Sequence, residues 1–170
     1  PFCRTPASES EGEYIERLTK RVDGDDASAM HNLGCLYARG EYGLPQNYDK
    51  AMELYLRAGE LGNAAAHCNI GVAYQCEQGV ERNMKKAMHY HGLAAMAGDA
   101  KARHNLGALE CGASNITRGM KHWMISAEAG LDEGHVTKDD FEKTLRAHKE
   151  AKDEMTSDQR EAVAAARSRN

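Results

Sequence analysis

The chain has 170 residues, and its 22 lysines and arginines against 26 aspartates and glutamates give a formal net charge of -4 at pH 7. This mild acidity disfavours nucleic acid as a partner, because a phosphate-binding protein needs a clustered basic surface. No apolar run approaches the roughly 18–20 residues that cross a bilayer, and the first residues lack the basic and apolar segments of a signal peptide. We therefore expect a cytoplasmic protein with neither nucleic acid nor membrane as a partner.

The cysteines point to the same reducing compartment. There are five, an odd number, and no secretory signal supports a disulfide framework. We expect four of them to be reduced thiols that pack as small apolar residues. These four are Cys35, Cys68, Cys76 and Cys111.

Residues 1–8 are predicted to be a disordered tail. The chain starts at Pro1 instead of Met, which we interpret as a processed or partial chain. Its first four residues, PFCR, resemble the end of a RING finger, whose last zinc-ligand pair is typically C-P-x-C. The resemblance implies that Cys3 is the final zinc ligand and that its partner precedes Pro1. The alternative is an ordinary cysteine in a frayed tail. One ligand cannot hold zinc by itself, since a structural site needs four.

Residues 9–25 are predicted to form an N-terminal capping helix. Tyr14, Ile15, Leu18 and Val22 recur at spacings of three and four residues, which places them on one helix face. This face is expected to pack against the element that follows.

A repeat organises the middle of the chain. The segment DASAMHNLG, which ends at Gly34, recurs as DAKARHNLG, which ends at Gly107, with seven of nine positions identical. Between them NAAAHCNIG ends at Gly71, so the three glycines lie 37 and then 36 residues apart. A fixed period of this length is typical of repeat architectures. It divides the chain into units of residues 26–62, 63–98 and 99–131.

Each unit is predicted to contain two antiparallel helices, which we call helix A and helix B. In helix B, small and aromatic residues recur at offsets of 4, 7 and 11, which places them on one face. These positions are Ala51, Tyr55, Ala58 and Gly62 in the first unit, Ala87, His91, Ala94 and Gly98 in the second, and Gly119, Trp123, Ser126 and Gly130 in the third. The repeated glycine occupies the same position in each helix A. Because glycine inside a helix costs about 1 kcal/mol relative to alanine, we expect two helix backbones to approach closely there.

Glycine, asparagine and aspartate mark the predicted helix ends. Gly62 and Gly98 are expected to end the B helices in the left-handed conformation. Asn63 and Asp99 are expected to cap the next A helices, because their side chains can accept hydrogen bonds from free N–H groups. B-helix N-caps are expected at Asn47, Asn83 and Asn115, and glycine turns at Gly43 and Gly79.

The repeated unit resembles that of a known family. The pattern A-x-x-x-L-G-x-x-Y, a glycine-rich loop and K-A-x-x-x-Y-x-x-A-x-x-x-G is similar to the Sel-like repeat, a relative of the tetratricopeptide α-solenoids. The first unit carries it in full, through Leu33, Gly34, Tyr37, Lys50, Ala51, Tyr55, Ala58 and Gly62. The third unit departs from it, with Glu110 for the tyrosine and Gly119 for the alanine. The resemblance covers about 105 of the 170 residues and implies a curved helical scaffold that binds other proteins.

After Gly130 a fourth unit begins, but its A helix is missing. The sequence passes instead to a helix start at Thr137, and a last helix is predicted from Thr156 or Ser157. Residues 132–170 are therefore predicted to be C-terminal capping helices. Either this pair caps the third unit directly or a segment has been lost.

We find no catalytic constellation in the sequence, since none of the phosphate-binding, metalloprotease or nucleophile-elbow motifs occurs. His31, Cys68 and His104 form one column across the repeats, but helices packed about 10 Å apart are too distant for zinc bonds of about 2.0–2.3 Å. We therefore expect no cofactor, apart from zinc in a RING finger upstream.

An asparagine column is the candidate binding site. Asn32, Asn69 and Asn105 flank the apolar stripe of the A helices. One interpretation is structural, with each amide satisfying backbone or loop groups between repeats. The other is functional, with the amides forming a ladder on the concave surface that clamps an extended peptide, because amides both donate and accept hydrogen bonds.

The sequence thus predicts an all-α, right-handed α-solenoid of three Sel-like helix pairs with helical caps. Its predicted function is protein–protein interaction as a scaffold or adaptor, without catalysis. The alternative is the substrate-recruiting part of a RING-type ubiquitin ligase, as the C-terminal part of a protist RING finger/Sel-like repeat protein. A ubiquitin-conjugating enzyme is a partner only under that alternative. The repeat positions expected to be structural are Gly34, Gly71, Gly107, Ala51, Ala87, Gly62, Gly98 and Gly130.

Overall fold

The structure is a computed structural model that describes residues 10–128 and Arg146. Within these residues it is all-helical, with seven helices and no strand. The helices are α1 (Glu11–Asp23), α2 (Ala27–Arg39), α3 (Tyr48–Glu60), α4 (Ala64–Cys76), α5 (Met84–Met96), α6 (Ala100–Gly112) and α7 (Ile116–Glu128). The tail over residues 1–8, Gly130 and the C-terminal helices predicted over 132–170 lie outside the described residues.

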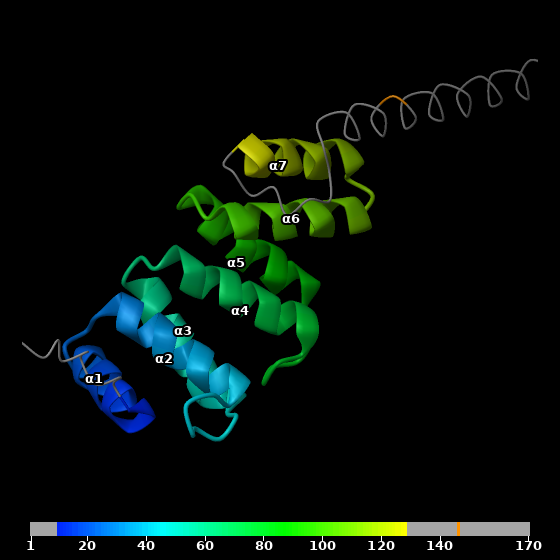
Figure 1. The fold of residues 1–170 in the computed structure, drawn as a ribbon. Coiled ribbons are helices and arrows are strands. Elements are labelled where there is room, and N and C mark those ends of the chain that lie inside the picture. The colour runs from blue at the N-terminus through cyan, green and yellow to red at the C-terminus, as the bar shows by residue number, and fades with distance from the viewer. Residues whose placement is uncertain (1–9, 129–145, 147–170) are drawn as a thin grey trace, which may run out of the picture.

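The helices stack in chain order into an elongated array, with α1 at one end and α7 at the other (Figure 1). Each helix packs against the next one in the chain, and α4 also contacts α6. Helices α2, α4 and α6 are the predicted A helices, and α3, α5 and α7 are the B helices. The predicted all-α solenoid of helix pairs is therefore confirmed over the described residues. The predicted N-terminal helix is α1, which buries Leu18 and Val22 against the first pair.

Polar side chains cap the helix starts at the predicted positions. The side-chain oxygens of Asn63 and Asp99 accept hydrogen bonds from the third backbone N–H of α4 and α6. Asn47 and Asn83 cap α3 and α5 in the same way. Each cap satisfies a donor that the helix itself leaves free. Asn115 also directly precedes its helix, but its side chain donates to Glu110 instead.

Glycines take the left-handed conformation where the chain leaves a helix or turns. Gly62 and Gly98 follow the B helices with φ of 86° and 91°. Gly43 and Gly79 turn between A and B helices with φ of 72° and 70°. These angles disfavour a side chain with a Cβ, because the Cβ clashes with the backbone. The predicted glycine turns are confirmed.

The glycine inside each A helix receives a ring from the B helix of the same pair. A Cβ on Gly71 would lie 2.7–2.8 Å from three atoms of the His91 imidazole, and a Cβ on Gly34 would lie 2.7 Å from the Tyr55 ring. The expectation that these glycines allow two backbones to meet was therefore wrong for Gly71, whose three nearest contacts all belong to a side chain. The missing Cβ makes room for a ring that fills the centre of the pair.

In the third pair (α6 and α7) the two helices pack more closely than in the first two pairs. A Cβ on Gly107 would lie 2.6 Å from the Trp123 ring and 2.9 Å from the Gly119 carbonyl oxygen. Gly119 occupies the register of Ala51 and Ala87, and a Cβ there would lie 2.6 Å from the Gly107 carbonyl oxygen. Glycine replaces the repeat's alanine because the two backbones do approach closely in this pair.

The third unit also departs from the repeat at its tyrosine position, where a glutamate is paired with an arginine. In the first two units a lysine ammonium lies over the tyrosine of helix A, 5.1 Å from the Tyr37 ring and 4.9 Å from the Tyr74 ring. Glu110 stands at this tyrosine position and is 3% exposed. Its carboxylate accepts a hydrogen bond from Asn115 and pairs with Arg118 at 3.3 Å. Arg118 has the register of the two lysines, so an ion pair replaces a cation–π contact.

Candidate functional site

The structure separates the three asparagines of the predicted site by exposure and by contacts. Asn32 is exposed, and Asn69 and Asn105 are half-buried. Asn69 Nδ2 lies 3.1 Å from His31 Nε2 and 3.4 Å from Cys35 Sγ, both on the preceding A helix. Asn105 Nδ2 lies 3.9 Å from Cys68 Sγ in the same direction. Two of the amides therefore bridge neighbouring repeats through side chains, where the structural interpretation expected backbone or loop groups.

Around Asn69 the structure brings together a polar cluster that we call the Cys35 cluster, consisting of His31, Cys35, Tyr55 and Asn69. His31 and Cys35 lie four residues apart on α2, and His31 Nε2 is 3.6 Å from Cys35 Sγ. The Tyr55 hydroxyl donates to the same sulfur at 3.5 Å. Tyr55 reaches it from α3 because its ring passes over Gly34. Three elements thus converge on one thiol.

The cluster shifts the acidity of its members. Burial opposes ionisation of Cys35, but the hydrogen bonds from His31 and Tyr55, together with the charges of His31 and Arg39, lower the pKa of the thiol on balance. The hydrogen bond to Cys35 raises the pKa of His31 above its ordinary value, although burial acts against it. Burial and the contact with Cys35 raise the pKa of Tyr55. The sulfur is the member of the cluster that favours negative charge.

A cavity of about 160 Å³ opens beside this cluster, between the first and second repeats. Cys35, Tyr55 and Asn69 line it, with residues from the last turns of α2 and α4 and the start of α3. Its polar wall includes the side chains of Arg39 and Gln78. The cavity is large enough for a side chain of another molecule. Asn69 lies in its wall, so a side chain that entered the cavity would contact Asn69.

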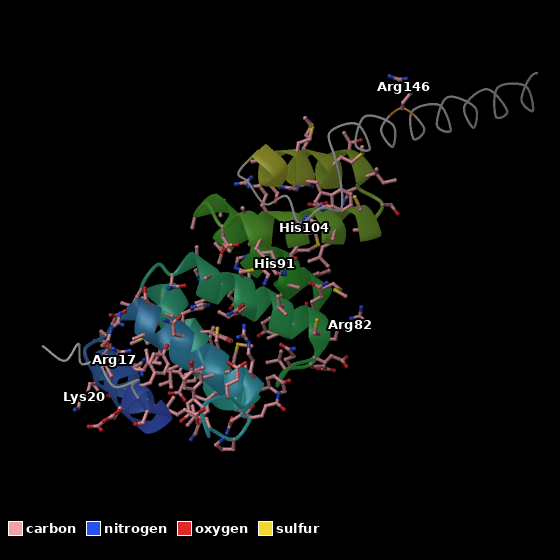
Figure 2. All side chains as sticks on the ribbon, in the orientation of Figure 1. Arg17, Lys20, Arg82, His91, His104 and Arg146 are labelled. Carbon is pink, nitrogen blue, oxygen red and sulfur yellow. The ribbon has the colours of Figure 1, made fainter. Side chains whose placement is uncertain are left out.

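The corresponding positions in the other repeats form a different environment. Cys68 stands at the position of His31 and is buried, and burial raises the pKa of its thiol to about 12. His91 stands at the position of Tyr55 and is fully buried inside the array (Figure 2). Among the described residues, neither of its ring nitrogens has a hydrogen-bond partner, and burial lowers the pKa of His91 to about 4. In the third repeat the Trp123 ring nitrogen donates to the His104 carbonyl at 3.0 Å.

The described cysteines are all free thiols, but their expected packing was partly wrong. Cys68 is buried as predicted, whereas Cys76 is exposed and Cys35 and Cys111 are half-buried. Cys76 is exposed because it ends α4 next to a left-handed residue, Glu77, where the chain leaves the array. The Cys35 cluster itself was missed by the sequence reasoning, although a histidine and a cysteine four residues apart on a helix are a visible signal.

Over 10–128 and at Arg146, no three His, Cys, Asp or Glu side chains gather closely enough to hold a metal ion. No helix of that part of the chain is long and apolar enough to cross a bilayer. Cys3, the candidate ligand of a RING finger, lies outside the described residues.

Comparison with solved structures supports the fold. A Sel1 repeat protein from Oxalobacter formigenes is 30% identical, with a TM-score of 0.65 over 69% of this chain and 49% of that one. The c5321 protein, a protective antigen of uropathogenic Escherichia coli that displays an SLR fold, is 27% identical, with a TM-score of 0.65 over 71% of this chain and 26% of that one. The chain therefore spans about half of the first relative and about a quarter of the second.

Comparison with protein families agrees with these structures. The family model of the Sel1 repeat matches residues 27–63 and 64–99, which contain the helix pairs α2–α3 and α4–α5. No curated protein matched the chain significantly. The RING-finger alternative gains no support from these comparisons. The matched repeats, together with the two structural relatives, show that the chain contains Sel1 repeats over residues 27–99.

Proposed function

We propose that this chain is a non-catalytic adaptor that binds a segment of another protein against its A helices, α2, α4 and α6. Sel1-repeat proteins generally bind other proteins, and their fold is typically a scaffold without catalysis. A stack of similar units offers an extended surface on which successive positions of a ligand meet equivalent residues. The asparagine column is such a set of equivalent residues.

The cavity between the first two repeats is the observation that carries this proposal. It has room for one side chain of a bound segment, and Asn69 lies in its wall. An amide has two donors and an acceptor oxygen, so Asn69 can hold the Cys35 cluster and also bind a ligand backbone. Arg39, which pairs with Glu41 at 3.7 Å, adds a cation to the lining of the cavity, which favours a segment that carries a carboxylate.

The test removes the amide column and compares it with a matched column on the B helices. Asn32→Ala, Asn69→Ala and Asn105→Ala are combined in one protein. The control combines Glu53→Ala, His89→Ala and Lys121→Ala, three exposed residues at one register of α3, α5 and α7. Each protein captures partners from native extract, and quantitative mass spectrometry compares them with wild type. We expect the amide variant to capture each specific partner in an amount at least about tenfold lower than wild type, because each lost hydrogen bond contributes about 0.5–1.5 kcal/mol.

Folding is checked by circular dichroism, since two of the three amides bridge repeats. If the triple variant unfolds, Asn32→Ala alone decides, because Asn32 is exposed and its side chain contacts its neighbour on the same helix, His31. Partners retained by a folded amide variant, or lost equally by the B-helix control, would contradict binding on the A helices.

A further inference from the structure

Three hydrogen-bonding groups converge on the sulfur of Cys35, and no other described cysteine has such an environment. Tyr55 and Asn69 donate to Sγ at 3.5 and 3.4 Å, and His31 Nε2 lies 3.6 Å away. The Cys111 thiol donates to the Ile116 carbonyl, at 4.0 Å, an acceptor that cannot stabilise a thiolate. Donors aimed at a sulfur favour its anionic form, which is the nucleophile in cysteine chemistry.

The neighbour of His31 leaves its Nε2 atom available to act as a base. Asn32 Oδ1 lies 3.3 Å from His31 Nδ1. A carbonyl oxygen only accepts hydrogen bonds, so Nδ1 carries the proton of the neutral ring, and the lone pair of Nε2 faces both the Asn69 amide at 3.1 Å and the Cys35 thiol at 3.6 Å. After Nε2 takes up a proton, the Asn69 amide can present its oxygen to it by a half-turn. The cluster thus has a nucleophile and a base, and the neighbouring Asn32 orients the base.

The sulfur is also reachable, because Cys35 lines the cavity of about 160 Å³ between the first two repeats. We propose that Cys35 is a covalent modification site for small soft electrophiles of the α,β-unsaturated carbonyl class, with His31 as its proton acceptor and donor. This proposal does not depend on the adaptor function, because it concerns a reaction of the chain with a small molecule.

The reaction balances without a further reagent. The Cys35 thiol gives its proton to His31 Nε2, and the thiolate attacks the β-carbon of the electrophile. A carbon–sulfur bond forms while the carbon–carbon π bond breaks, and its electron pair moves onto the carbonyl oxygen as an enolate. His31 returns the proton to the α-carbon, which leaves a neutral thioether. His31, Tyr55 and Asn69 end in their starting state, while Cys35 is left as the thioether.

The other repeats explain why the site is confined to the first one. At the register of Cys35 the second repeat has Val72 and the third has Ala108. The second repeat also has Cys68 in place of His31, and burial raises the pKa of that thiol to about 12. The exposed Cys76 is the reference thiol within the same molecule.

The test measures alkylation of each cysteine in the folded, full chain by N-ethylmaleimide, a small α,β-unsaturated imide, with peptide mass spectrometry as the readout. At pH 6.5 an ordinary thiol is only about 1% thiolate. We expect Cys35 to react about tenfold faster than Cys76 at this pH.

Two variants link the rate to the cluster. His31→Gln removes the base and is expected to reduce the Cys35 rate at pH 6.5 to that of Cys76 or below, with Cys76 unchanged. Tyr55→Phe removes only the hydroxyl and should slow Cys35 by about threefold, roughly the effect of one hydrogen bond. If wild-type Cys35 reacts no faster than Cys76, or if folded His31→Gln reacts at the wild-type rate, the proposal is overturned. If His31→Gln does not fold, the Tyr55→Phe comparison decides in the same way.

Discussion

Replacing Gly71 by alanine is expected to destabilise the array by about 1–3 kcal/mol, the usual cost of overpacking a core. The new Cβ would lie 2.7–2.8 Å from the His91 imidazole, which is fully buried. In a His91→Ala background the same change should instead stabilise the array by up to about 1 kcal/mol. The ring is then gone, and alanine is the better helix former. Urea unfolding of the four proteins of this cycle measures both effects.

Gly107 provides the control for this cycle. There the added Cβ would also meet the Gly119 carbonyl oxygen at 2.9 Å, and a backbone atom cannot be removed by mutation. Gly107→Ala should therefore stay destabilising in a Trp123→Ala background. An equal cost of Gly71→Ala with and without the His91 ring would contradict the role that we assign to the glycine.

The stability of the array is expected to fall by about 2 kcal/mol between pH 7 and pH 5, owing to His91. Burial lowers the pKa of His91 to about 4 in the folded chain, while the charge of Asp99 acts weakly in the opposite direction. In the unfolded chain the pKa returns to about 6.5. Between these values the unfolded state binds the proton that folded His91 refuses. Stability is therefore present above about pH 6.5 and is lost as the pH falls toward 4. Urea unfolding at several pH values measures this slope.

The contribution of His91 is isolated by His91→Phe, which keeps a ring against Gly71 and cannot titrate. Burial also lowers the pKa of His67 and of His122, and the shift of His31 has the opposite sign. These groups remain in both proteins, so the difference between wild type and His91→Phe belongs to position 91. Identical pH profiles for the two proteins would show that His91 does not control acid stability.

Much of this fold could be predicted from the sequence because its signals are local. The caps at Asn63 and Asp99 and the turns at Gly62 and Gly98 depend on the backbone needs of single residues. The 36- to 37-residue period then fixes which helices are equivalent. The reason for the glycine in helix A could not be predicted in the same way. It depends on a ring that approaches from another helix, about 20 residues further along the chain.

The candidate site was predictable only in part for the same reason. The asparagine column is visible in the sequence, and the structure places Asn69 at the cavity between two repeats. The Cys35 cluster was not recognised, because Tyr55 and Asn69 reach the sulfur from α3 and α4, 20 and 34 residues away. The column of His31, Cys68 and His104 was considered as a set of metal ligands and rejected on distance. The partner of His31 proved to be a cysteine on its own helix.

The central claim, that a partner segment lies against the A helices beside the cavity, is tested most directly by photocrosslinking. A benzophenone amino acid replaces Arg39 or Gln78 at the cavity wall, and His89 or Lys121 on the exposed surface of the B helices. We expect one and the same protein to be crosslinked from positions 39 and 78, and we expect no crosslink to that protein from positions 89 and 121. Crosslinks that form equally from the B helices, or only from there, would contradict the claim.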